Sequence, residues 1–175
     1  LDAVLFLLGV SREEIEAAFG DREMDYESLH KLNYVVGVLN EAMRLYPPFW
    51  MVDRVALDKD EICGLEIPAG TTVVPYIYGV HRNADLWEDP ARFDPSRFIG
   101  KNKRHPFAHI PFGGGPRVCI GQNMAIMQML LVIVAIVRRY DFKLYPDKTI
   151  DMRAMMILRP DGPITMDFAR IPAAV

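Results

Sequence analysis

A glycine-rich loop constrains this chain of 175 residues more than any other feature of the sequence. It reads Pro-Phe-Gly-Gly-Gly-Pro-Arg-Val-Cys-Ile-Gly over residues 111–121, and its cysteine is Cys119. Three successive glycines allow backbone conformations closed to other residues and a close approach to a flat partner, while the two prolines stiffen the loop. Apolar residues then recur at helical spacing from Ala125 to Val137, before Arg138 and Arg139. The pattern predicts a buried helix with Cys119 just before its N-terminus.

The predicted position of Cys119 favours a metal-binding thiolate. Unpaired backbone N–H groups and the positive end of the helix dipole stabilise negative charge there, and Arg117 precedes the cysteine by two residues. Most lone cysteines are instead small buried hydrophobes, so Cys119 decides nothing by itself. The wider pattern Phe-x-x-Gly-x-Arg-x-Cys-x-Gly fixes five residue types, and its chance rate is roughly below one in a million per position. The pattern therefore outweighs the default interpretation.

These five residues resemble the haem-binding signature of the cytochrome P450 family, here as Phe112, Gly115, Arg117, Cys119 and Gly121. The resemblance implies a mainly α fold with small antiparallel β-sheets (α+β), the C-terminal part of the cytochrome P450 fold. It implies that residues 1–175 are the C-terminal haem-binding part, with the upstream half absent. It also implies that haem b (iron protoporphyrin IX) is the cofactor and that Cys119 is the catalytic residue and axial ligand of its iron.

A second motif lies on the clearest amphipathic helix, predicted over residues 28–45 from apolar residues at helical spacing. Glu41 and Arg44 are three residues apart and therefore share one face. A pair of this kind is usually a weak surface ion pair, but here it borders the apolar stripe, and burial would require a further partner. By resemblance to the family's Glu-x-x-Arg helix and its later Pro-x-Arg-Phe element, that partner is Arg97, in a structural network with Glu41 and Arg44.

Between these motifs the sequence predicts short strands and residues that line a pocket. Residues 53–56, 61–67 and 71–77 alternate like strands of a small antiparallel sheet. By resemblance, Arg54 and Arg117 bind the two haem propionates. Residues that line the substrate pocket in the family, or that equally well fill a core, are Phe49, Trp50, Met51, Val52, Met155 and Met156.

Other segments have simpler interpretations. Ser11-x-x-Glu14 predicts a capping box at the start of a helix that extends to Phe19. Lys101, Lys103, Arg104 and His105 form a basic run near the loop, and such runs are usually solvated. A formal net charge of −3 gives no reason to expect nucleic acid as a partner. Two cysteines without metal-type spacing argue against a zinc site or a disulfide framework.

The resemblance implies a haem-thiolate monooxygenase that inserts an oxygen atom from O2 into an apolar organic substrate, in a chain expected to be inactive alone. It implies a separate redox donor, a ferredoxin or a flavin reductase. Two alternatives stay open: haem-thiolate peroxygenase or isomerase chemistry, and a non-enzymatic haem-binding module. The longest apolar run is too short to span a membrane. We expect a cytoplasmic protein if it is bacterial, and the missing N-terminal part leaves membrane anchoring open.

Overall fold

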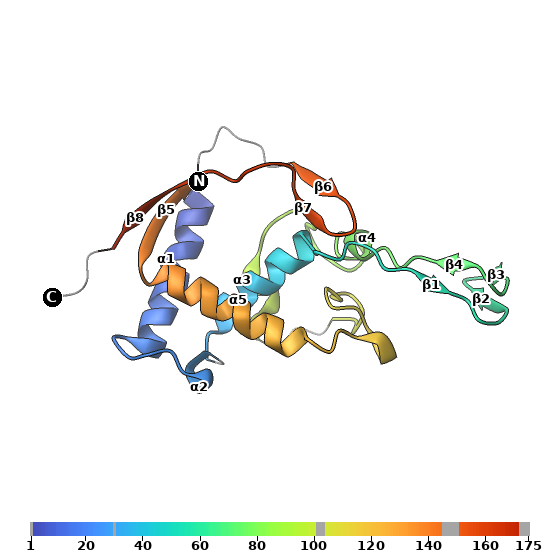
Figure 1. The fold of residues 1–175 in the computed structure, drawn as a ribbon, viewed down its shortest axis with the longest axis horizontal. Coiled ribbons are helices and arrows are strands. Elements are labelled where there is room, and N and C mark those ends of the chain that lie inside the picture. Colours follow the sequence, from blue (N-terminus) through green and yellow to red (C-terminus); the bar gives the residue numbers. More distant parts are fainter. Residues whose placement is uncertain (1, 30, 101–103, 145–150, 172–175) are drawn as a thin grey trace.

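The computed structural model describes residues 2–29, 31–100, 104–144 and 151–171. Helices and small antiparallel sheets alternate along the chain, and together they form the mainly α architecture (Figure 1). The helical elements are α1 (Asp2–Phe19), α2 (Tyr26–Leu29), α3 (Asn33–Leu45), α4 (Ile77–Val80), the short 3-10 helices η1 (Pro95–Phe98) and η2 (Gly115–Arg117), and α5 (Gln122–Val137). The strands are β1 (Arg54–Val55), β2 (Asp60–Ile62), β3 (Leu65–Ile67), β4 (Thr72–Val73), β5 (Tyr140–Leu144), β6 (Met152–Ala154), β7 (Leu158–Pro160) and β8 (Met166–Arg170).

The hydrophobic core lies where α1, α3 and α5 meet (Figure 1). Helix α3 contributes Val35, Leu39 and Met43, which are four residues apart and therefore line one face. The opposing side chains come from the end of α1, from α2 and the segment after it, and from α5: Ile15, Phe19, Leu29, Leu32, Leu130, Val134 and Val137. The helix predicted over residues 28–45 is thus two helices, because α3 begins only at Asn33.

The capping box predicted at Ser11 is wrong, because α1 is continuous from Asp2 to Phe19 and Ser11 is buried within it. Glu14 caps a different helix. Its carboxylate accepts the backbone N–H groups of Tyr34 (2.8 Å) and Val35 (2.9 Å), in the first turn of α3. A carboxylate at this end satisfies unpaired donors and complements the helix dipole.

Within the described residues, four two-stranded antiparallel sheets accompany the helices: β1 with β4, β2 with β3, β5 with β8, and β6 with β7. The first two pairs form an arm that extends away from the helices (Figure 1). Residues 61–67 do not form the single strand that their alternation predicts. They contain a hairpin, because Cys63 (φ 51°) and Gly64 (φ 81°) turn the chain between β2 and β3.

Replacing Glu14 by Ala should lower the free energy of unfolding by about 1–2 kcal/mol, because two backbone donors of α3 lose a charged acceptor. Glu13→Ala is the matched control, since Glu13 is the exposed neighbour on the same helix and its loss should stay within about 0.5 kcal/mol. Urea unfolding of both variants measures the difference. Equal losses would show that the cap contributes nothing.

Candidate functional site

The most deeply buried charges of the described chain are Glu41 and Arg44 on α3, and both side chains are 0% exposed. The guanidinium of Arg44 binds the carboxylate through two parallel contacts of 2.7 Å, Nε to Oε2 and Nη2 to Oε1. This bidentate geometry is the strongest that an arginine makes with a carboxylate. It also leaves further donors and lone pairs that need partners in the interior.

Backbone groups from the segment after α4 supply these partners. The Nη1 atom of Arg44 donates to the carbonyls of His81 and Pro90, both at 2.8 Å, and Nη2 also donates to the carbonyl of Arg92 at 3.1 Å. The carboxylate of Glu41 accepts the backbone N–H of Asp94 at 2.8 Å. The ion pair therefore fixes four points of an irregular segment on one helix.

Arg97 lies at the same carboxylate, with its Nε atom 3.4 Å from Oε1 of Glu41, and it donates to the carbonyl of Asp89 at 3.0 Å. The three residues predicted to form a network are thus brought together. Helix η1, which carries Arg97, packs closely on α3 at the buried Gly37. A methyl group added there would lie 3.0 Å from the carbonyl oxygen of Pro95, tighter than ordinary contact.

A ring cluster covers this network, and it changes the interpretation of Arg104. The guanidinium of Arg104 lies over the rings of Trp87 (4.9 Å) and Phe98 (4.5 Å), and that of Arg44 lies 5.0 Å from the Trp87 ring. Burial lowers the pKa of Arg104. Arg104 is therefore not a solvated member of a basic run, whereas Lys101 and Lys103 lie outside the described residues.

Two histidines connect α3 to the glycine-rich loop. The buried His81 ring contacts the Arg44 carbonyl through Nδ1 (3.2 Å) and the backbone N–H of Ile110 through Nε2 (2.9 Å). The His109 ring stacks on it at 5.2 Å between centroids. Burial lowers the pKa of His81 to about 4, and burial together with the neighbouring His81 lowers the pKa of His109 to about 3.

The glycine-rich loop itself places Cys119 two residues before Gly121, the residue that precedes the first turn of α5. The Cys119 N–H donates to the Phe112 carbonyl at 3.0 Å and closes the loop. Gly113 (φ 76°) and Gly115 (φ 67°) have the left-handed conformation that this closure requires. The thiol of Cys119 is exposed at the surface of the described chain, as expected of a group that binds an added partner.

The residues predicted to contact a cofactor surround this loop or lie on the arm. Phe112 packs against the helical core beside the loop, whereas Arg117 on η2 is exposed. Arg54 is the first residue of β1, is also exposed, and donates to the neighbouring Asp53 carbonyl at 2.7 Å. Both guanidinium groups are therefore accessible to a carboxylate.

The two segments predicted to line a pocket meet each other. The indole N–H of Trp50 donates to the Met155 carbonyl at 2.7 Å, and the Leu158 N–H donates to the Pro48 carbonyl at 2.8 Å. Met155 and Met156 lie in the turn between β6 and β7. The remaining side chains form an exposed apolar set, with Phe49 51%, Met51 42%, Met155 50% and Met156 85% exposed.

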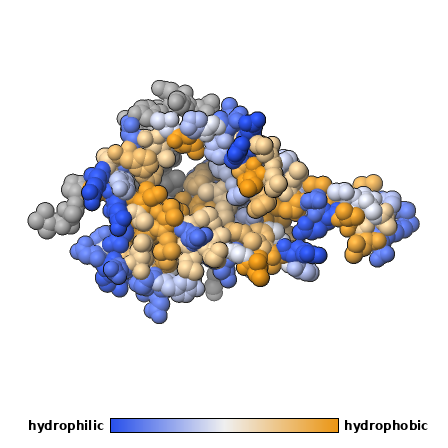
Figure 2. All heavy atoms as spheres, viewed as in Figure 1, coloured by the Kyte–Doolittle hydropathy of each residue, from blue (hydrophilic) through white to orange (hydrophobic). Residues whose placement is uncertain are grey.

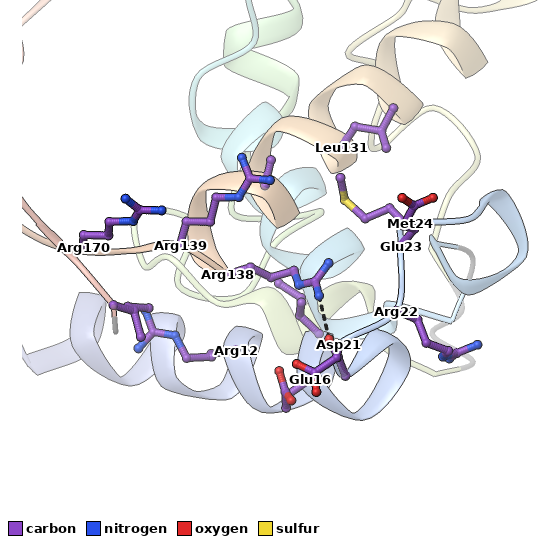
Figure 3. Close-up of a pocket in the computed structure, with 14 residues that line it drawn as sticks. Arg12, Glu16, Asp21, Arg22, Glu23, Met24, Leu131, Arg138, Arg139 and Arg170 are labelled. Atoms are coloured by element: carbon purple, nitrogen blue, oxygen red, sulfur yellow. Dashed lines mark hydrogen bonds between the residues drawn. The ribbon is translucent and has the colours of Figure 1, made fainter. Parts of the chain in front are cut away.

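A separate pocket lies at the opposite end of α5 from Cys119, between α1, the end of α5 and β8 (Figure 3). Its arginines are Arg12, Arg22, Arg138, Arg139 and Arg170, and its acidic residues are Glu16, Asp21 and Glu23. Arg12 pairs with Asp141 at 2.8 Å, and Arg138 donates to the Gly20 carbonyl at 2.6 Å. The mixed charges and internal pairing favour no single ligand chemistry there.

Sequence reasoning missed several residues of this site. The sequence predicts no site role for His81, Trp87 or His109. Their roles depend on contacts with residues up to 69 positions away in the chain. The carbonyls of Pro90 and Arg92 carry no side-chain signal, so no sequence pattern could have identified them.

Comparison with known proteins identifies the family that has this architecture. The cytochrome P450 family model matches residues 11–168. The chain belongs to the cytochrome P450 family, whose members are haem-thiolate monooxygenases. The resemblance and the α+β fold expected from the sequence are thereby confirmed.

Among the relatives, cytochrome P450 734A5 of Oryza sativa subsp. japonica is 42% identical over 156 residues, 86% of this chain and 29% of that protein. Cytochrome P450 3A12 of Canis lupus familiaris is 39% identical over 160 residues, 89% of this chain and 32% of that protein. The solved structure of retinoic acid-bound cyanobacterial CYP120A1 superposes with a TM-score of 0.91 at 29% identity, over 97% of this chain and 40% of that one. The chain thus spans about a third of the curated relatives that it matches.

The residues around Cys119 fit a haem. Among the described residues no three His, Cys, Asp or Glu side chains group to hold a bare metal ion, whereas a single thiolate suffices for iron already held by a macrocycle. A methyl group added at Gly113 or Gly115 would meet no side chain within 4 Å, so a flat ring can approach the backbone there, whereas the Phe107 ring covers Gly114. No helix in the described part of the chain is long and apolar enough to cross a membrane.

Arg44→Met should lower the free energy of unfolding by about 3–5 kcal/mol, because it leaves the Glu41 carboxylate buried without its partner. Arg153→Met is the matched control: its ion pair with Asp161 is exposed (58% and 56%) and measures 3.7 Å, so its loss should stay within about 0.5 kcal/mol. Chemical denaturation compares the two. A loss below 1 kcal/mol for Arg44→Met would contradict the network's role.

The depressed pKa values of His81 and His109 predict a pH dependence of stability. Both histidines are neutral when folded, and an unfolded histidine binds a proton near pH 6.5, so the unfolded chain holds more protons below that pH. The free energy of unfolding should therefore fall as the pH drops from about 6.5 towards 4. The Asp94 carboxyl contributes separately: hydrogen bonds from Ser96 lower its pKa, so its contribution disappears only below pH 3.8.

Unfolding curves across this range, for the parent protein and for a variant with the exposed His105 replaced by Gln, test this prediction. The two profiles should fall in parallel. A flat profile of the parent between pH 6.5 and 4.5 would contradict it.

Proposed function

We propose that this chain is the thiolate-bearing part of a haem-thiolate monooxygenase, with Cys119 as the axial ligand of haem b. One observation carries the proposal: an exposed cysteine lies just before an apolar helix, on a glycine-rich loop that its own N–H closes by donating to the Phe112 carbonyl. When bound, haem iron with a thiolate ligand activates dioxygen for transfer of one oxygen atom to a substrate. The chain's own residues bind, orient and shield that group.

Individual residues have separate proposed roles around the group. Backbone N–H groups after Cys119 moderate the charge of its sulfur, and Phe112 shields it from water. Arg54 and Arg117 hold the two propionates through paired N–H donors. The apolar set at Phe49, Met51, Met155 and Met156 fits an apolar substrate, and a ferredoxin or flavin reductase supplies the electrons.

We further propose that residues 1–175 are the C-terminal haem-binding part of a longer enzyme and are inactive alone. Helix α5 is apolar on all sides from Met129 to Val137, where the sequence predicts a buried helix. Only Leu130, Val134 and Val137 are buried, whereas Met124 is 63%, Val132 57% and Ile136 37% exposed. Apolar side chains gather along this region of the surface (Figure 2). A face of this kind is suited to packing against further polypeptide.

The absorption spectrum of the reduced, carbon-monoxide-bound protein tests the ligand assignment. We expect a strongly red-shifted Soret band, which reports a thiolate on the iron. Cys119→Ala should abolish that band, because the ligand is lost, whereas Cys63→Ala should keep it, because Cys63 lies in the β2–β3 turn of the arm that extends away from the helices. Persistence of the band in Cys119→Ala, or its loss in Cys63→Ala, would refute the assignment.

A further inference from the structure

We propose that His81 and His109 are positioning residues that hold the entry of the Cys119 loop against α3. The proposal rests on how these two side chains are placed. Their rings stack on each other, and each ring hydrogen-bonds the backbone of α3, His81 at Arg44 and His109 at Asn40. His81 also binds Ile110, so both rings act on the two residues before Pro111. For its effect on iron ligation this inference rests on the function proposed above. Its effect on the loop itself does not depend on that function.

The hydrogen bonds of His81 fix its tautomer. A carbonyl oxygen can only accept, so Nδ1 of His81 must donate its proton to the Arg44 carbonyl. A backbone N–H can only donate, so Nε2 of His81 must accept from Ile110. The ring is therefore neutral and spans the gap between α3 and the loop with one donor and one acceptor.

His109 repeats this connection one helical turn earlier. It hydrogen-bonds the backbone of Asn40, four residues before Arg44, while its buried Nε2 has no hydrogen-bond partner in the described structure. The rings stack with an interplanar angle of 28°, in register with successive turns of α3. Burial, together with charge repulsion from Arg44, disfavours the protonated form of both rings.

The connection continues from these rings to the cysteine. Ile110, held by His81, accepts the Gly113 N–H at 3.0 Å through its carbonyl. The buried Pro111 stiffens the step between them, and the next carbonyl, that of Phe112, accepts the Cys119 N–H at 3.0 Å. A short run of hydrogen bonds therefore links α3 to the backbone of Cys119.

Two substitutions at His81 separate positioning from space-filling. The terminal amide of Gln reaches the place of Nε2, so His81→Gln keeps an acceptor for Ile110. The shorter amide of Asn reaches only the place of Nδ1, so His81→Asn keeps the donor to Arg44 and loses the acceptor. Both changes remove the ring, so a purely structural role predicts similar effects.

The first readout is amide hydrogen exchange of the protein without haem. We expect His81→Asn to accelerate exchange of the Ile110, Gly113 and Cys119 amides at least tenfold relative to His81→Gln, with amides of α1 unchanged in both. Equal exchange in the two variants, or acceleration spread evenly over α1 and α5, would overturn the proposal. If His81→Asn fails to fold, His109→Phe replaces it, because Phe keeps a ring to stack and removes the donor to Asn40. Its Ile110 amide should exchange faster than in the parent, and unchanged exchange would overturn the proposal.

The second readout is the reduced carbon-monoxide spectrum. The red-shifted fraction should fall at least twofold in His81→Asn and recover in His81→Gln, and equal fractions in the two variants would count against positioning. If the parent protein itself lacks a red-shifted band, the proposed function fails, and the exchange comparison still decides the role of the histidines.

Discussion

The bidentate contact between Arg44 and Glu41 is the constraint on which the rest of this structure depends. Removing two charges from water is costly, and their mutual attraction offsets that cost only if the remaining donors and lone pairs are also satisfied. The carbonyls of His81, Pro90 and Arg92 and the N–H of Asp94, all from the segment after α4, meet this requirement. The segment that supplies them has little regular structure of its own. Its path is therefore determined by the helix on which it packs.

The contact explains how an irregular chain can hold a cysteine in one place. Arg44 holds His81 through two hydrogen bonds. Its guanidinium donates to the His81 carbonyl, and its main-chain carbonyl accepts from Nδ1 of the His81 ring. That ring holds Ile110, and the glycine-rich loop begins immediately afterwards. A buried ion pair is weak evidence for stability in itself. Here its consequence is specificity, because its partners come from four separate positions of residues 81–94, which must follow one path to reach it.

The sequence predicted the parts of the site whose signal is local. The loop motif and the Glu41–Arg44 spacing are readable in short windows, as are α1, α3 and α5, although the helix boundaries were only approximate. The α+β class came from the family resemblance. The family resemblance was also needed to associate Arg97 with the helix. Features that depend on distant contacts could not be predicted: Glu14 appeared to cap its own helix and instead caps α3. The Cys63–Gly64 turn was missed because a strand-like alternation runs through it.

The most direct test of this account is iron K-edge X-ray absorption of the haem-loaded protein with Cys63 replaced by Ala. Because the chain has two cysteines, that substitution leaves Cys119 as its one thiol. The account predicts a sulfur atom in the first coordination shell of the iron, at thiolate distance, which disappears when Cys119 is also replaced. A shell of nitrogen and oxygen atoms alone in the single variant would contradict it.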